Sequence, residues 1–239
     1  MVGLGPGGAL DRTTRAETAL RASEVIVGYR RYLDYVADVI AGKEIYAFGM
    51  RRETDRCRKA LECASKGKTV SLVCSGDAGV YGMAGLTLEI ADESGLEVDI
   101  EIVPGVTAAV AAAAVVGAPL TADYAAISLS DLLIPWETIR KRLEAVAAAD
   151  LVVALYNPRS RGRTKQFDEA MAILRRYRDA STPAAVATAV GTAEERVHVT
   201  TLGDIDPEQV DMRTIVIVGN SQSRVLSSGH FVTARGYRL

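Results

Sequence analysis

The residues best suited to chemistry in this 239-residue sequence lie in one stretch, Ser75–Gly82, which reads Ser-Gly-Asp-Ala-Gly-Val-Tyr-Gly. Its three glycines remove side chains where a ligand could meet the backbone. The stretch carries a carboxylate, Asp77, and no Lys or Arg, so it suits a ligand that has hydroxyl groups or positive charge. A purely structural alternative is a tight strand-to-helix turn in which Asp77 caps the helix.

Two further glycine loops accompany this stretch. Gly3–Gly8 formally matches the dinucleotide pattern GxGxxG. We do not favour a nicotinamide cofactor there, because Pro6 removes a backbone N–H that would hold a pyrophosphate. The acid expected at the end of the second strand is also absent, since that strand ends in Gly28 and Tyr29. The third loop is Pro104–Ala108.

Composition limits the other kinds of site. The two histidines, His198 and His230, are too few and too far apart in sequence for a His-based metal centre or a Ser-His-Asp triad. The three cysteines show no CxxC spacing and are predicted to be reduced, buried thiols of a cytoplasmic protein: Cys57, Cys63 and Cys74. We therefore predict no metal site.

Charge and hydropathy limit the partners. The formal net charge of −2 gives no electrostatic reason to expect a nucleic-acid partner. We find no signal peptide and no uncharged apolar run of about 18 residues, so the sequence predicts no membrane partner. With hydrophobic residues at 49% of the chain, a substantial core can form.

The elements that must position these loops alternate between strand and helix. A predicted strand over 69–74 leads into Ser75–Gly82 and a helix over 82–92, and an alternating strand over 98–103 leads into Pro104–Ala108 and an Ala-rich helix from Thr107. Because both segments run in the order strand, loop, helix, we expect their loops to open on the same edge of a mostly parallel sheet.

The second half of the chain has a different pattern. Strands are predicted over 124–129, 151–156, 184–190, 196–201 and 214–218, with helices over 137–148 and 167–178. The later strands follow one another without long helices between them, which indicates a mixed sheet. Gly117–Pro119 interrupts the pattern. We predict two α/β domains, an N-terminal one over 1–118 and a C-terminal one over 119–239.

In combination, the glycine loops resemble a known family. The Gly3–Gly7, Ser75–Gly82 and Pro104–Ala108 loops look like the three signatures of the tetrapyrrole methylases, which are S-adenosylmethionine enzymes of two α/β domains with the cofactor in the cleft between them. Two more stretches, Ile127–Trp136 and Leu155–Ser160, resemble the precorrin-3B C17-methyltransferases of cobalamin synthesis. The resemblance covers nearly the whole chain. It departs from the family pattern at Ala122, where a His is expected.

The resemblance implies a cofactor, S-adenosylmethionine, that leaves as S-adenosylhomocysteine. Carried over residue by residue, it implies cofactor contacts at Pro6, Gly76, Asp77, Val80, Thr107, Ala108, Tyr156, Asn157 and Ala193. Each of these residues also has a structural interpretation: Pro6 could shape a turn, Thr107 could cap a helix, and Tyr156 could belong to the core.

The implied substrate is a large tetrapyrrole rich in carboxylates. Arginine guanidinium groups pair well with carboxylates, and three arginines directly follow a predicted strand: Arg159, Arg161 and Arg163. A solvated face is the alternative for any one of them. Ser130 and Asp131 follow another strand end and are expected to touch substrate, with Asp131 as a candidate proton acceptor. A structural role as helix caps is equally open for both.

The reaction implied by the resemblance is methylation at C17 of the macrocycle with contraction of the ring, on a metal-free or a cobalt-bearing substrate. Three alternatives stay open: a sister methylase acting at another carbon or on a protein side chain, a non-catalytic module that binds a nucleotide or tetrapyrrole, and a nicotinamide oxidoreductase. The family resemblance also implies a homodimer.

Overall fold

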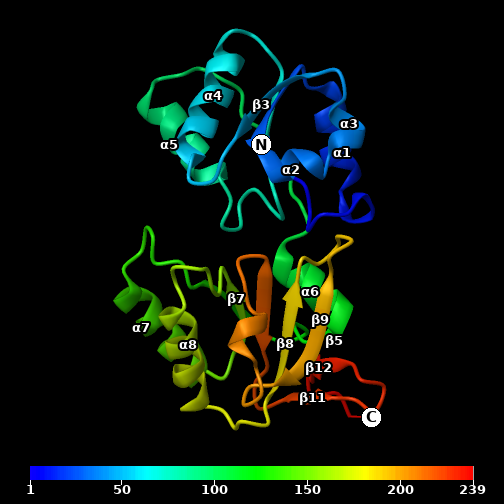
Figure 1. The fold of residues 1–239 in the computed structure, drawn as a ribbon, viewed down its shortest axis with the longest axis vertical. Helices are drawn as coiled ribbons and strands as arrows, with labels where there is room; N and C mark the ends of the chain where they lie inside the picture. The colour runs from blue at the N-terminus through cyan, green and yellow to red at the C-terminus, as the bar shows by residue number, and fades with distance from the viewer. Residues whose placement is uncertain (239) are drawn as a thin grey trace. The chain divides into compact units, whose positions relative to one another are not determined.

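The computed structural model describes residues 1–238 and divides the chain into two compact units. The first spans Met1–Ala108 and the second starts at Ala109. Both combine helices with β-sheet (Figure 1), as the sequence predicts. The domain boundary that we place after residue 118 stays a prediction.

The first unit contains a four-stranded sheet in which every pairing is parallel. The strand order is β1 (Val2–Gly3), β4 (Val70–Cys74), β2 (Val25–Tyr29) and β3 (Glu44–Phe48). The sequence prediction of a mostly parallel N-terminal sheet is therefore confirmed. Because the strands are parallel, the loops that follow them leave from the same edge of the sheet.

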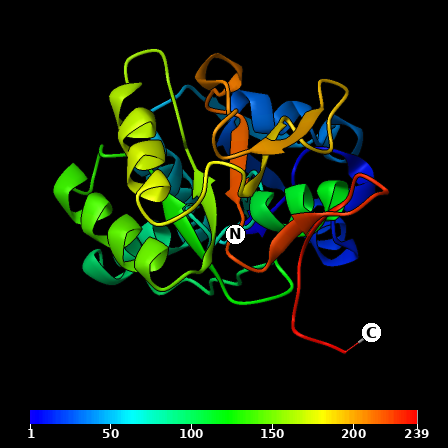
Figure 2. The same cartoon turned by 90° about the horizontal axis from the view of Figure 1, so that it is seen from below.

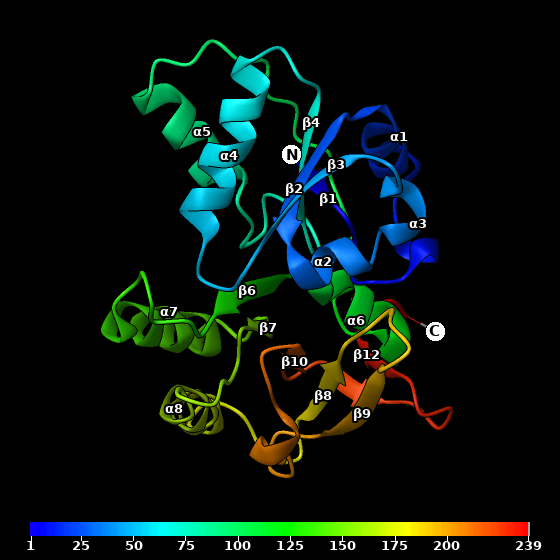
Figure 3. The same cartoon turned by 45° about the horizontal axis from the view of Figure 1, so that its top comes forward.

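Helices cover both faces of this sheet (Figure 3), so its inner strand β2 is buried on both sides. Successive residues of β2 show this: Ile26 packs into one core, and Val25 and Val27 pack into the other. The first core includes residues of α1 (Thr14–Ala22), α2 (Arg30–Asp34) and α3 (Ala37–Ile40), and the second includes residues of α4 (Glu53–Ser65) and α5 (Ala84–Glu93). A short 3-10 helix, η1, spans Ala9–Asp11.

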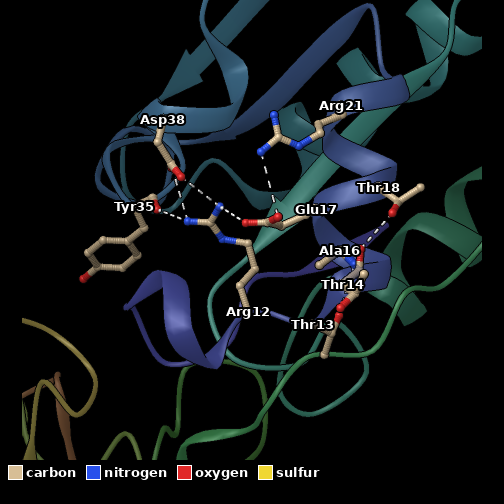
Figure 4. A network of polar contacts seen from close by, with 9 residues as sticks. All are labelled: Arg12, Thr13, Thr14, Ala16, Glu17, Thr18, Arg21, Tyr35 and Asp38. Atoms are coloured by element: carbon tan, nitrogen blue, oxygen red, sulfur yellow. Dashed lines mark hydrogen bonds and ion pairs between the residues drawn. The ribbon is translucent and has the colours of Figure 1, made fainter.

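A buried arginine ties the start of α1 to α3 (Figure 4). Only 2% of the Arg12 side chain is exposed. Its guanidinium donates to the carbonyl oxygen of Tyr35 at 2.8 Å and lies 3.3 Å from carboxylate oxygens of both Glu17 and Asp38. With its charge and both Nη groups partnered, Arg12 can remain in the interior. These contacts fix the loop that follows the Gly3–Gly8 stretch.

The strand predicted over 98–103 is not formed. Val103 alone pairs, in an isolated parallel bridge with Val2. The cause is its neighbour: β1 is two residues long, so residues before Val103 have no ladder partner. Instead, a groove of about 490 Å³ separates 97–101 from Thr69–Leu72 of the β4 region.

The second unit contains a mixed five-stranded sheet, which confirms the sequence prediction. The order is β6 (Tyr124–Ser128), β7 (Val152–Tyr156), β10 (Thr214–Val218), β8 (Pro183–Thr188) and β9 (Arg196–Thr201). β6 and β7 are parallel, whereas β10 is antiparallel to both β7 and β8, and β9 is antiparallel to β8.

The main core of this unit lies between the sheet and two helices, α7 (Trp136–Ala148) and α8 (Lys165–Arg175). A second, three-stranded sheet has the order β11 (Ser223–Val225), β12 (Phe231–Thr233) and β5 (Gly117–Ala118), with β5 following the Ala-rich helix α6 (Ala108–Val116) (Figure 2). The 3-10 helix η2 spans Pro207–Gln209. Within residues 1–238, every helix falls short of the length and apolar character needed to span a membrane.

Candidate cofactor and substrate site

The first two glycine loops meet at the carboxyl edge of the parallel sheet. Gly5 and Gly76 exchange two backbone hydrogen bonds: the Gly5 N–H donates to the Gly76 oxygen at 3.0 Å, and the Gly76 N–H donates to the Gly5 oxygen at 2.7 Å. Gly5 and Gly76 have φ angles of 78° and 65°, in the left-handed region that glycine adopts without strain. The loop of Pro6 is thereby fixed against the loop of Asp77.

The third loop packs against the other two so closely that side chains are excluded. A Cβ atom placed on Gly105 would lie 2.2 Å from the carbonyl oxygen of Gly76, and one on Gly3 would lie 2.7 Å from the Gly105 nitrogen. Glycine is required at both positions because backbone atoms occupy the space that a side chain would need. The three loops therefore form one backbone cluster.

Asp77 joins this cluster through both of its carboxylate oxygens. Oδ1 accepts a hydrogen bond from the Gly79 N–H at 2.7 Å, and Oδ2 accepts one from the Gly105 N–H at 2.9 Å. The structural alternative of a helix cap does not hold, because α5 begins at Ala84 and its N-cap residue is Met83. Each oxygen keeps a further lone pair, so the half-buried carboxylate can still accept from a ligand.

The remaining predicted cofactor residues of this unit belong to the same cluster. A Cβ on Gly76 would lie 3.8 Å from Thr107 Cα and 3.9 Å from the Ala108 nitrogen, which is ordinary contact distance. Val80 is 38% exposed, and Pro6 is half-buried. The structure thus gathers the loops of Pro6, Gly76, Asp77, Val80, Thr107 and Ala108, three segments that are far apart in the sequence.

In the second unit, strand register gathers the other predicted residues at one edge of the mixed sheet. Ser128 is paired with Tyr156 at the ends of β6 and β7. Thr188 at the end of β8 is paired with Thr214 at the start of β10, and β10 lies beside β7. The segments that follow β6, β7 and β8 therefore leave from the same edge. They carry Ser130 and Asp131, Asn157, and Ala193 in turn.

Tyr156 and Asn157 are held in different ways. Tyr156 is 9% exposed, and its hydroxyl accepts a hydrogen bond from the Ala109 N–H in the first turn of α6 at 3.0 Å, a group that has no partner inside the helix. Asn157 has a φ angle of 48°, and its Nδ2 donates to Ser128 Oγ at 3.0 Å. Ala193 lies exposed in the turn between β8 and β9.

Asp131 is engaged by a residue that sequence reasoning did not identify. Gln166 Nε2 donates to Asp131 Oδ2 at 2.6 Å, and Arg163 Nε lies 4.0 Å from Oδ1. Gln166 is in the first turn of α8 and belongs to none of the motifs. The signal available in the sequence was only its place, one turn after the arginine-rich stretch.

The three predicted substrate arginines have different environments. Arg159 donates to the Pro207 carbonyl oxygen and to Glu208 Oε1, both at 2.7 Å. The Arg163 side chain is 11% exposed and binds backbone carbonyls of its own unit. Arg161 is exposed and forms no hydrogen bond or ion pair with any residue of 1–238. The exposed one is thus available to an external anion.

The cysteine thiols are buried and are poorly suited to act as nucleophiles. Cys57, Cys63 and Cys74 are all free and buried, and burial raises the pKa of the Cys57 and Cys74 thiols above the ordinary value. A raised pKa disfavours the nucleophilic thiolate. In the part of the chain that the structure describes, no group of three or more His, Cys, Asp or Glu side chains could hold a metal ion.

Comparison with known proteins identifies the family. Residues 1–206 match the profile of the Tetrapyrrole (Corrin/Porphyrin) Methylases. A probable cobalt-factor III C(17)-methyltransferase of Salmonella typhimurium is 46% identical, covering 100% of this chain and 99% of its own. A precorrin-3B C(17)-methyltransferase of a Sinorhizobium species is 42% identical over 95% of this chain and 90% of its own.

The fold comparison agrees with the sequence comparison. The crystal structure of the methyltransferase CobJ matches with a TM-score of 0.90 and 40% identity, covering 98% of both chains. The chain spans about half the length of two other relatives, 45% and 52%. These matches extend over both units and include all three glycine loops. The chain belongs to the tetrapyrrole methylase family.

Proposed function

We propose that this protein is an S-adenosylmethionine-dependent C-methyltransferase that methylates C17 of a precorrin-3-type macrocycle, with contraction of the ring, in cobalamin biosynthesis. The observation that carries the proposal is full-length similarity, at 46% and 42% identity, to proteins named for C17 methylation. The backbone cluster of the three glycine loops supports it, because these loops are the family signatures in this chain.

The glycine-loop cluster fits the proposed cofactor by its own geometry. At Gly3 and Gly105 a Cβ atom would collide with neighbouring backbone, so the three loops can hold one fixed surface of backbone groups. Gly76, Thr107 and Ala108 would offer backbone donors and acceptors to the cofactor. Asp77 would accept a hydrogen bond from a ribose hydroxyl or lie near the positively charged sulfur of S-adenosylmethionine. We assign Pro6 and Val80 to apolar contacts, and from the second unit Tyr156, Asn157 and Ala193 to the adenine side.

The proposed role of these residues is to align the reactants. S-adenosylmethionine, when bound, supplies a methyl group on a positively charged sulfur; a carbon nucleophile of the substrate attacks the methyl group in line, and the sulfur leaves as S-adenosylhomocysteine. The residues named above orient the two reactants, which removes much of the entropic barrier to a reaction between them. Such a displacement needs no resident metal and no covalent protein nucleophile, which is consistent with the buried thiols.

For the substrate we assign the edge of the mixed sheet. Arg161 would pair with a peripheral carboxylate of the macrocycle. Ser130 and Asp131 lie at the end of β6, where Asp131 could accept a proton, although Gln166 already donates to one of its oxygens. The two relatives compared above are named for cobalt-factor III and for precorrin-3B, so we propose the C17 reaction for the macrocycle class that includes both.

The assembly and location follow as parts of the same proposal. We propose a homodimer in the cytoplasm, on the basis of the family resemblance and of the reduced, buried cysteines. Sedimentation of the purified protein across a range of concentrations tests the dimer directly.

Turnover on defined substrates tests the function. Purified protein is incubated with S-adenosylmethionine and either precorrin-3B or cobalt-factor III, and the products are analysed by mass spectrometry and NMR. We expect one added methyl group at C17, one equivalent of S-adenosylhomocysteine and a contracted ring.

Each other outcome supports a different activity. Methylation at another carbon or on a protein side chain would identify a sister methylase. Binding of S-adenosylhomocysteine without any methylated product would favour a non-catalytic module. Binding of NAD in place of S-adenosylhomocysteine in calorimetry would favour the oxidoreductase and refute the proposal.

A further inference from the structure

A tight turn after β7 places two nearby arginines, Arg161 and Arg163, in different environments. Ser160 and Arg163 exchange two backbone hydrogen bonds, Ser160 N–H to Arg163 O at 3.0 Å and Arg163 N–H to Ser160 O at 3.1 Å. Arg161 and Gly162 therefore form the tip of the turn, where both are exposed. Arg163 is at the base of the turn, and only 11% of its side chain is exposed.

The Arg163 guanidinium binds the segments that follow two neighbouring strands. Nη1 donates to the carbonyl oxygen of Leu129, after β6, at 2.8 Å. Nη2 donates to the carbonyl oxygen of Asn157, after β7, at 2.6 Å, and lies 3.5 Å from Met212 Sδ, before β10. One rigid, planar group thus spans three segments at the edge of the mixed sheet.

The same contacts hold two residues to which the proposed function assigns ligands. The Asn157 backbone has a left-handed φ of 48°, a conformation that asparagine adopts more readily than most non-glycine residues, and its carbonyl oxygen accepts from Arg163 Nη2. Asp131 lies 4.0 Å from Arg163 Nε. Burial lowers the pKa of the Arg163 guanidinium, and the Asp131 carboxylate opposes that change.

We propose that Arg163 is a positioning residue that clamps the Asn157 turn to the Leu129–Asp131 loop, and that Arg161 is the cation of this turn that binds the substrate. The inference rests on the proposed function. It gives different roles to Arg161 and Arg163, both of which the sequence pattern assigned to substrate binding. Arg163 acts on the cofactor side through Asn157, because both of its Nη groups are already bound to backbone oxygens. Arg161 has no partner among residues 1–238 and is available to a carboxylate.

Paired substitutions at the two positions test the division. Arg163→Lys keeps the charge but cannot reach several carbonyl oxygens with one planar group. We expect its Kd for S-adenosylhomocysteine, measured by calorimetry, to rise roughly tenfold, which corresponds to the loss of about one charge-assisted hydrogen bond. Arg161→Lys, the matched control for the change of side chain, should leave the Kd for S-adenosylhomocysteine near the parent value.

Removal of each charge gives the complementary result. Arg161→Gln should raise the KM for the tetrapyrrole several-fold and leave the Kd for S-adenosylhomocysteine unchanged, and the difference in KM should shrink at high salt because the pair is exposed. Arg163→Gln should weaken S-adenosylhomocysteine binding at low and at high salt alike. If Arg163→Lys binds S-adenosylhomocysteine like the parent, or if Arg163→Gln changes only the tetrapyrrole KM, the clamp is refuted.

A milder variant covers the case in which Arg163 substitutions prevent folding. Ser128 Oγ accepts from Asn157 Nδ2 at 3.0 Å and from the Ser130 N–H at 3.2 Å, so it joins the same two segments. Ser128→Ala should fold and bind S-adenosylhomocysteine several-fold more weakly, with the salt dependence of KM retained. Unchanged binding in Ser128→Ala would refute the coupling between these segments and the cofactor.

The binding readout also separates this inference from the proposed function. Calorimetry with S-adenosylhomocysteine requires no turnover. A parent protein that binds S-adenosylhomocysteine but methylates neither macrocycle refutes the C17 activity, while the Arg163→Lys result still decides the clamp. A parent that does not bind S-adenosylhomocysteine refutes both.

Discussion

At the scale of single residues, Asp77 illustrates how a candidate ligand group can also be structural. Its two oxygens accept from the Gly79 and Gly105 N–H groups, so an amide in its place would direct an NH₂ group at one of these donors. We predict that Asp77→Asn lowers the free energy of unfolding by about 1–3 kcal/mol and weakens S-adenosylhomocysteine binding. Denaturant unfolding and calorimetry measure the two effects.

The control for this variant is an aspartate that forms no such bonds. Asp92 is exposed near the end of α5, and Asp92→Asn should change the stability by less than about 0.5 kcal/mol. If Asp77→Asn matched Asp92→Asn in both measurements, the carboxylate would not be what joins the loops.

Sequence reasoning at this scale found the glycines but not their partners. Gly76 and Gly105 were recognisable because glycine is the usual residue where a backbone adopts a left-handed conformation or approaches another group closely. The partner of Asp77 lies 28 residues away, and Gln166 lies 35 residues from Asp131. No local pattern predicts such pairs, because they depend on which strands become neighbours.

At the scale of elements, the close approach of the three loops can be tested by adding one methyl group. In Gly105→Ala the new Cβ would lie 2.2 Å from the Gly76 oxygen, so the loops must separate. We predict a loss of about 1–3 kcal/mol of stability and of S-adenosylhomocysteine affinity. At Gly85, in α5, a Cβ would have no neighbouring atom within 4 Å, so Gly85→Ala should stabilise the protein by about 0.5–1 kcal/mol.

The outcome that would contradict this prediction is equal behaviour of the two variants. Unfolding of Gly105→Ala at the same denaturant concentration as the parent would mean that the three loops are not packed backbone to backbone.

The groove beside β4 gives a second prediction for elements. Residues 98–103 alternate as a strand should, but only Val103 has a ladder partner, and β4 pairs with β2 alone at Val70–Leu72. About four alternating apolar residues joined before Met1 would continue β1 between these two segments. We predict a gain of about 1–3 kcal/mol in unfolding free energy and slower amide exchange at 98–102.

Proline provides the matched control, because it cannot donate to a ladder. An extension of equal length with prolines at alternate positions should leave the stability unchanged. Equal stability of the apolar and proline extensions would show that the groove does not accept a strand. The case also shows why the 98–103 prediction was wrong: alternation records which face is buried, whereas a strand also needs a partner along its length.

At the scale of the whole molecule, ligand binding should appear as stability. A ligand that binds only the folded state at about a hundred times its Kd adds about 2.7 kcal/mol, which for a chain of this size raises Tm by roughly 5–10 °C. We predict that shift for S-adenosylhomocysteine and none for NAD, measured by scanning calorimetry. A shift with NAD alone would support the oxidoreductase.

Fold class was predictable at this scale because it depends on many weak signals that agree. Alternation of strands and helices indicated the parallel sheet of the first unit, and consecutive strands indicated the mixed sheet of the second. The pairing of β12 with β5 was not predictable, since these strands are only three and two residues long and carry too little pattern to be recognised.

The pairing of β12 with β5 has a consequence for biosynthesis. Gly117 and Phe231 are partners in this ladder, and Phe231 is fully buried, so the second unit joins its beginning to its end. On the ribosome, the first unit can fold once residue 108 has emerged, because domains generally fold as units during synthesis. The second unit cannot complete its fold until Phe231 has emerged, so its apolar strands remain exposed and prone to aggregation for longer during synthesis.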